Sequence, residues 1–207
     1  MPQRQGYTFL GYYTVANNIT SSQTPSGTQI IDATGKIVSA NTFFNDTNTT
    51  NKATTIYAGW KRIDYTVDYQ QGTATGGTLP TDVKAPYMTT VTIGTNNMTK
   101  DKDVKGTFTV TFQYNNGQSN TSLTSSNYVV YTALGGWTTT SGGTSITDPF
   151  SNGAKWRITG NTVLYPAFSQ ATSAYDSITL PTPTAKSGYT MEGWYNGSTK
   201  IGDAGAT

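Results

Sequence analysis

The side chains that most often perform chemistry in proteins are scarce in this sequence. Its 207 residues include no histidine and no cysteine. The commonest general base, the commonest metal ligand and any thiolate or disulfide are therefore missing. Eleven acidic residues remain, and Glu192 is the only glutamate among them. The sequence predicts that the protein is not an enzyme and holds no cofactor or metal.

Two pairs of aspartates are the remaining candidates for acid chemistry or ion binding. Asp64 and Asp68 fall on one face of a predicted strand, but a glycosidase would need two carboxyl groups that converge in a cleft. Asp101 and Asp103 fall in a predicted loop and could offer oxygens to Ca²⁺, although no calcium-loop ligand run accompanies them. Solvated surface carboxylates are the better interpretation of both pairs.

Lysines and serines offer no clearer chemistry. An isopeptide crosslink would need a lysine and an asparagine beside a buried acid, and the spacing around Lys36 or Lys155 does not single out either one. The serines have no histidine partner and no Gly-x-Ser-x-Gly elbow. The paired glycines are not followed by the Lys-Ser/Thr pair of a phosphate-binding loop, so they do not predict a phosphate site.

Aromatic side chains are the richest chemical feature, with 14 tyrosines, 7 phenylalanines and 4 tryptophans. In an exposed row they could stack on sugar rings. At matching positions of a repeat they would instead form its core, and we favour that interpretation. The predicted repeat-core motif consists of Tyr7, Phe9, Tyr12, Trp60, Phe108, Phe112, Trp137, Tyr165, Tyr189 and Trp194.

These aromatics lie in phrases that the chain repeats. The phrase GYTMEGWY at 188–195 matches GYTFLGYY at 6–13, and YTALGGWT at 131–138 is a weaker copy. Alternate residues of a strand point to the same face, so Phe9 and Gly11 lie together. The pattern predicts a strand whose glycine lets a neighbouring backbone approach closely.

Two further phrases recur. TTIYAGWK at 54–61 returns as TVLYPAFS at 162–169, and DYTVDY at 64–69 returns as TFTVTF at 107–112. The strict alternation of apolar and polar residues in the last pair predicts half-buried strands. Asn116-Gly117 follows the second of them and predicts a turn, because both residues tolerate a positive φ.

The order TVTF, GYTFxGWY, TLYAxW resembles the Listeria–Bacteroides repeat, found as the B repeat of listerial internalins and in many large bacterial surface proteins. Tyr12 stands where that family usually has tryptophan, and the middle copy lacks the leading Gly-Tyr. The resemblance implies tandem small β-grasp-like modules with antiparallel sheets and at most a short helix. The residues alone indicate a mostly β chain, and immunoglobulin-like β-sandwich modules are the alternative.

The repeats divide the chain into three parts. Residues 1–62 form a first module that is truncated at its N-terminus, and 63–170 a longer second module, or two fused repeats with a sub-boundary near 105. Residues 171–207 form a partial third repeat. Polar stretches at 16–27 and 45–51 are predicted connectors. Because the chain starts and stops inside repeats, we expect it to be a piece of a longer protein.

Composition narrows the functional classes. Threonine is about one residue in five, far above average usage, and it solvates strands without adding charge. The formal net charge of +2 is too small to indicate a nucleic-acid partner, and no apolar run is long enough to insert into a membrane. No signal peptide opens this fragment.

These features together with the resemblance predict a Thr-rich structural protein outside the cell, at a bacterial cell surface. Its expected function is that of an adhesin's stalk or spacer. Two alternatives are a self-assembling filament subunit that pairs through sheet edges and a carbohydrate-binding module. The expected partners are neighbouring repeats of the same protein, other copies of the chain, or host and cell-wall glycans.

Overall fold

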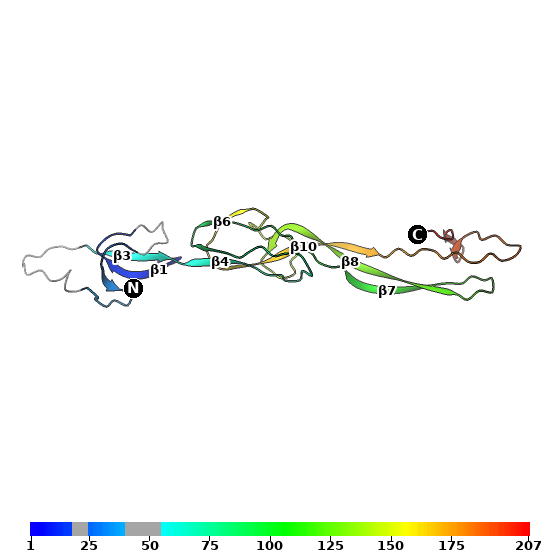
Figure 1. Cartoon of the computed structure of the whole chain (residues 1–207), viewed down its shortest axis with the longest axis horizontal. Helices are drawn as coiled ribbons and strands as arrows, with labels where there is room; N and C mark the ends of the chain where they lie inside the picture. The colour runs from blue at the N-terminus through cyan, green and yellow to red at the C-terminus, as the bar shows by residue number, and fades with distance from the viewer. Residues whose placement is uncertain (18–24, 40–54) are drawn as a thin grey trace, which may run out of the picture.

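The computed structural model describes residues 1–17, 25–39 and 55–207. Strands make up 46% of the structure, and there is no helix within these ranges. The prediction of a mostly β chain is thereby confirmed. The molecule is elongated, with a small sheet at its N-terminal end, a larger sheet in the middle and two hairpins at the other end (Figure 1). The predicted connectors 16–27 and 45–51 fall mainly outside the described residues.

The first sheet has three antiparallel strands in the order β2-β1-β3. They are β1 (Tyr7–Tyr13), β2 (Gln29–Asp32) and β3 (Tyr57–Arg62). Ile30 is almost fully buried, and the ring centroids of Phe9 and Trp60 lie 5.3 Å apart. The turn after β2 is held by Asp32, whose Oδ1 accepts the backbone N–H of Thr34 at 2.8 Å.

The central sheet has five strands in the order β5-β4-β10-β8-β7. They are β4 (Asp64–Tyr69), β5 (Val83–Pro86), β7 (Asp103–Phe112), β8 (Thr121–Thr138) and β10 (Thr162–Tyr175). The pair β4–β10 is parallel, whereas the other neighbours are antiparallel. The expectation of purely antiparallel sheets is therefore wrong for this one. The long connection between β4 and β10 is what allows them to run in the same direction.

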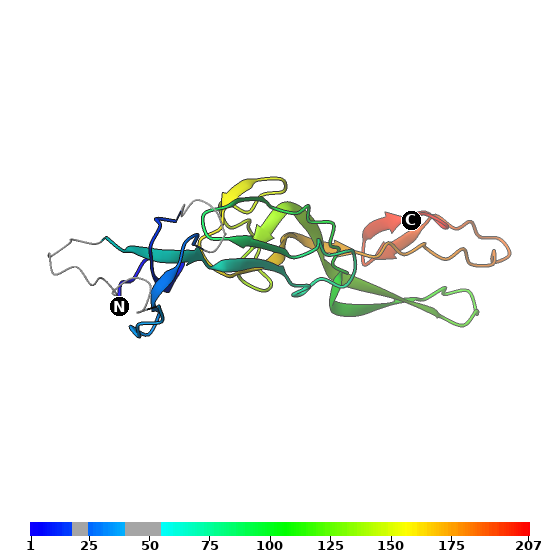
Figure 2. The same cartoon turned by 60° about the vertical axis from the view of Figure 1, so that its left-hand side comes forward.

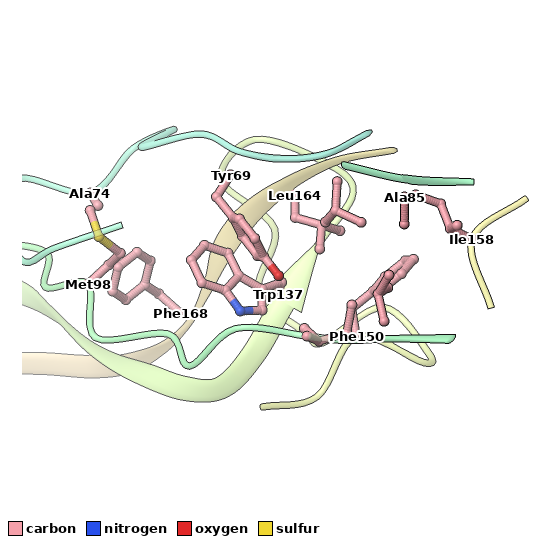
Figure 3. Packing of buried hydrophobic residues seen from close by; sticks show 12 residues of the cluster. Tyr69, Ala74, Ala85, Met98, Trp137, Phe150, Ile158, Leu164 and Phe168 are labelled. Atoms are coloured by element: carbon pink, nitrogen blue, oxygen red, sulfur yellow. The ribbon is translucent and has the colours of Figure 1, made fainter. Parts of the chain in front are cut away.

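The main core lies against the middle of this sheet. Leu164 of β10 is fully buried between residues of the flanking strands, including Tyr69 and Trp137 (Figure 3). A two-stranded sheet of β6 (Thr90–Thr92) and β9 (Lys155–Arg157) contributes further. Its Val91 and the neighbouring Ile158 belong to the same buried cluster.

The β7–β8 hairpin extends away from this core, as two views of the molecule show (Figure 1 and Figure 2). One face is lined by threonine and serine, and the hydroxyls of Thr111 and Ser122 lie 3.0 Å apart. The other face carries the alternating apolar residues, of which Phe112 is buried while Phe108 remains 52% exposed. The predicted turn at Asn116-Gly117 lies in the loop that joins the strands, and Gly117 has a positive φ of 90°.

The last hairpin consists of β11 (Trp194–Asn196) and β12 (Thr199–Gly202). Its Trp194 packs on Phe112 with 4.8 Å between ring centroids. The segment before it is tied to the tip of the β7–β8 hairpin, because Gln118 Oε1 accepts the backbone N–H of Thr184 at 2.9 Å. A small second core results, made of Phe112, Leu180 and Trp194.

Candidate binding surface

The aspartates singled out in the sequence do not form an acidic site. Asp64 and Asp101 are exposed, and Asp68 accepts a hydrogen bond from its neighbour Gln70 Nε2 at 2.7 Å. In the described ranges there is no group of three or more acidic, histidine or cysteine residues able to hold a metal ion. Surface solvation thus accounts for these carboxylates.

Asp103 lies on β7 instead of in a loop. The hydroxyl of Tyr131 donates to Asp103 Oδ2 over 2.5 Å, and Lys105 Nζ lies 3.8 Å from the same oxygen. The hydrogen bond from Tyr131 is the main cause that lowers the pKa of Asp103, and the same bond raises the pKa of Tyr131. The two directions agree, because the bond favours a charged carboxylate and a neutral phenol.

The two lysines considered for an isopeptide crosslink are both exposed. The ammonium group of Lys155 donates to the hydroxyl of Thr92. Lys36 follows the turn that Asp32 holds, and Asp32 Oδ1 accepts the backbone N–H of Lys36 at 3.0 Å. Neither lysine has the buried surroundings that such a bond would need.

The predicted repeat-core residues divide into three groups by exposure. Trp60, Phe112, Trp137 and Trp194 are buried. Tyr7, Phe9, Tyr12 and Tyr165 are half-buried. Phe108 and Tyr189 are 52% and 70% exposed, so the expectation of a core position is wrong for these two. Phe108 lies on the part of the hairpin that projects from the body, and Tyr189 lies in a loop where Lys186 Nζ is 4.8 Å from its ring centroid.

The glycine before the aromatic residue has the same contact in all three copies of the first phrase. A Cβ at Gly11 would lie 2.2 Å from the carbonyl oxygen of Ile31, and one at Gly136 would lie 2.8 Å from that of Phe150. At Gly193 the corresponding distance, to Gly202 O, is 2.8 Å. Each glycine therefore admits a neighbouring backbone, as its pattern predicts.

The tryptophans of the middle and last copies make matching hydrogen bonds. The indole N–H of Trp137 donates to Gly94 O at 2.8 Å, and that of Trp194 donates to Pro181 O at 2.9 Å. Both acceptors directly follow a buried aliphatic residue, Ile93 or Leu180. We call the part built on the central sheet the central unit, and the part that contains β11 and β12 the last unit. In each unit the indole holds the segment that carries the buried aliphatic residue.

The backbones around these aliphatic residues also correspond. Ile93 accepts from Gly153 N at 3.0 Å and donates to Ala154 O at 2.9 Å. In the last unit, Leu180 accepts from Gly205 N at 2.8 Å and donates to Ala206 O at 2.7 Å. Each glycine has a positive φ, 72° for Gly153 and 78° for Gly205, so an identical Gly-Ala turn holds both segments.

The aromatic partner of each tryptophan comes from the third repeated phrase. Tyr69 ends that phrase on β4 and lies 4.7 Å from Trp137 between ring centroids. Phe112 ends it on β7 and lies 4.8 Å from Trp194. Strand β7 therefore supplies the aromatic partner for the tryptophan of the last unit, as β4 does for the tryptophan of the central unit. At the same time β7 is hydrogen-bonded into the central sheet.

The two units differ in what lies beside this strand. In the central sheet, the edge of β4 is covered by β10, and Leu164 pairs with Tyr69. The outer edge of β7 has no paired strand among the described residues. It borders a groove of about 630 Å³. The groove is lined by Thr109, Val110, Thr111, Phe112, Gln113, Asn115, Ile178, Leu180, Trp194, Tyr195, Asn196 and Ile201.

Sequence reasoning missed this groove. The match between DYTVDY at 64–69 and TFTVTF at 107–112 was a usable signal, because equivalent strands should have equivalent neighbours. The phrases do not show that 107–112 packs against Trp194, which lies far along the chain. Nor do they show that the hairpin containing 107–112 belongs to the central sheet.

Comparison of the chain with protein-family models, with curated proteins and with solved structures found no significant match. Within the described ranges, no helix has the length and apolar character needed to cross a membrane. The geometry of the molecule is therefore the basis for any functional proposal.

Proposed function

We propose that this chain is a structural and adhesive region of a bacterial cell-surface protein, acting as a stalk or spacer outside the cell. The region would consist of β-grasp-like modules in tandem, which display or connect other domains. The modules follow the sequence boundaries 1–62, 63–170 and 171–207, with β7 shared between the second and the third.

The recurrence of one local geometry carries this proposal. The glycine contact, the indole hydrogen bond, the Gly-Ala turn and the aromatic partner all return in the central and last units. The glycine, the tryptophan and its aromatic partner belong to phrases that the sequence repeats. Repeats that contact mainly their neighbours are typical of extended arrays with a structural function. The elongated arrangement in Figure 1 supports the same interpretation.

Sheet order supports the β-grasp-like description of the central module. Its parallel pair β4–β10 lies in the middle, with β5 and the C-terminal half of β8 as antiparallel neighbours on the two sides. A β-grasp sheet has the same mixed arrangement. The short sheet β6–β9 and irregular segments occupy the face on which a helix would otherwise pack.

A filament subunit is the second candidate, because each of the two larger sheets ends in strands that have only one partner strand among the described residues. Strands β2 and β3 are terminal in the first sheet, and β5 and β7 are terminal in the central sheet. Open edges are templates for pairing between chains. A carbohydrate-binding module has less support. It would need exposed aromatics in a row, whereas the exposed aromatics of the described ranges are spread over β3, β7, β10, β11 and a loop; they are Tyr57, Phe108, Tyr175, Tyr195 and Tyr189.

Small-angle X-ray scattering on the purified chain tests the spacer proposal. A compact domain of this length would have a radius of gyration of about 17 Å, so a stalk should exceed this value clearly and keep it over a wide concentration range. A radius near the compact value would contradict the proposal. Growth with concentration would favour the filament subunit.

Location needs a separate experiment. Antibodies raised against the chain should label intact cells of the source organism without permeabilisation. Labelling that requires lysis would refute a surface location, whatever the shape of the molecule.

A further inference from the structure

We propose that the groove between β7 and β11 is a docking site for one extended β-strand with the pattern of the TVLYPAF phrase, donated by a separate polypeptide. The strand would add to the outer edge of β7 and run parallel to it. This inference rests on the geometry that recurs within the chain and does not depend on a stalk function.

The shape of the groove fits a strand. Its walls include the last four residues of β7 (109–112), Gln113 directly after them and all of β11 (Trp194–Asn196). Consecutive residues of a strand point to alternate faces, so they can border one groove together only through the strand's edge. Two strand edges therefore face each other across the groove, and β-strand addition uses the unpaired backbone groups of such edges.

The central unit shows how such a strand would lie. There, β10 runs parallel to β4, with Thr162 opposite Val67 and Leu164 opposite Tyr69. The residues that correspond on β7 are Val110 and Phe112. A strand in the same register would place its leucine beside Phe112 and close to Trp194, as Leu164 lies with Tyr69 and Trp137 (Figure 3).

The chemistry of the walls restricts the occupant. No acidic or basic side chain lines the groove, and Ile178, Leu180 and Trp194 form its apolar part. An uncharged strand with alternating apolar residues matches this lining, because a charge buried there would have no partner. The TVLYPAF phrase has no charged residue.

Strand β3 of a second copy fits less well, although it carries the related phrase. It ends in Lys61 and Arg62, and one of its edges is already paired with β1 along its length. In the docked arrangement, β1 of that copy would compete with β11 for the same position. The occupant is therefore a strand that is not already flanked by a sheet.

A synthetic peptide with the sequence of residues 160–170, GNTVLYPAFSQ, serves as the probe. It is added to the full chain, and amide hydrogen exchange is followed by mass spectrometry. Binding should slow exchange in 109–113 by about tenfold or more, because backbone N–H groups on the open edge would become donors to the added strand. Exchange in the first sheet should not change.

Two control peptides define specificity. A scrambled peptide of the same composition and a peptide with Leu164→Asp should both leave exchange in 109–113 unchanged. Equal protection by either control would overturn the proposal, as would the absence of protection at saturating peptide. Faster exchange in β10 (Thr162–Tyr175) without protection of 109–113 would also overturn it, because the peptide would then be replacing β10 beside β4. So would a dimer formed through β7 that the peptide does not disturb.

Discussion

A methyl group at Gly136 should destabilise the central unit. Gly136 lies on β8 directly before the fully buried Trp137, and its own carbonyl accepts a hydrogen bond from Asn96 Nδ2 at 2.9 Å. In Gly136→Ala the new Cβ would lie 2.8 Å from Phe150 O and 2.9 Å from Ser151 Cα. The Phe150 carbonyl also accepts the backbone N–H of Trp137 at 2.9 Å, so the methyl group would disturb a bond within the core.

The magnitude follows from overpacking. Inserting a methyl group into a packed core typically costs about 1–3 kcal/mol. Replacing glycine by alanine returns about 0.4–1 kcal/mol by restricting the unfolded chain. The net loss should be roughly 1–2 kcal/mol, and the unfolding midpoint of a unit of about 100 residues should fall by about 4–16 °C.

The adjacent glycine provides a matched control. A Cβ at Gly135 would meet only Asn152 Nδ2, 3.9 Å away, so Gly135→Ala should be neutral or stabilising by up to about 1 kcal/mol. Thermal unfolding followed by the near-ultraviolet circular dichroism of the buried aromatics measures both variants. If the two variants shifted the midpoint equally, or if Gly136→Ala melted like the unsubstituted chain, close backbone approach would not be the reason for this glycine.

Three further substitutions test the contacts around the tryptophans and β7. Trp137→Phe removes the indole bond to the carbonyl of Gly94 and should lower the free energy of unfolding, measured with urea, by about 1–3 kcal/mol. Trp194→Ala should free the last unit from the hairpin, so that limited proteolysis after β10 becomes faster while the melting of the central unit is unchanged. Tyr131→Phe removes the bond that lowers the pKa of Asp103. The lowered pKa of this carboxyl stabilises the folded state at a pH above the unfolded-state pKa of about 4, and the contribution is lost as the pH falls through the lower pKa of the folded state. The variant should therefore be less stable at pH 7. The difference should shrink as the pH falls below about 4 and disappear once Asp103 is protonated in the folded protein. A difference that persisted in acid would exclude Asp103 as the linked group.

Local sequence patterns were sufficient for some of the strands. The alternation in 64–69 and 107–112 predicted β4 and most of β7, and the glycine in each copy of the first phrase predicted a close backbone contact that all three copies make. The alternation of apolar and polar residues and the position of a glycine can both be read from a few consecutive residues, so these features are local.

The long-range pairing could not be predicted in the same way. Alternation shows which residues of a strand share a face, but it does not show whether another element covers that face. Phe108 and Phe112 occupy equivalent positions in the pattern, yet only Phe112 is covered, because Trp194 reaches it and nothing comparable reaches Phe108. The parallel position of β10 likewise depends on contacts between segments that are far apart in sequence.

The parallel pairing of β4 with β10 has a mechanical consequence. The chain enters the central unit at the start of β4 and leaves it at the end of β10, and parallel strands place these two points at opposite ends of the pair. Tension along the molecule would therefore load the hydrogen bonds between β4 and β10 in shear, all at once, instead of opening them one at a time as in a zipper. Rupture in shear requires the larger force, so the central unit should be the last part of the chain to yield when its two ends are pulled apart.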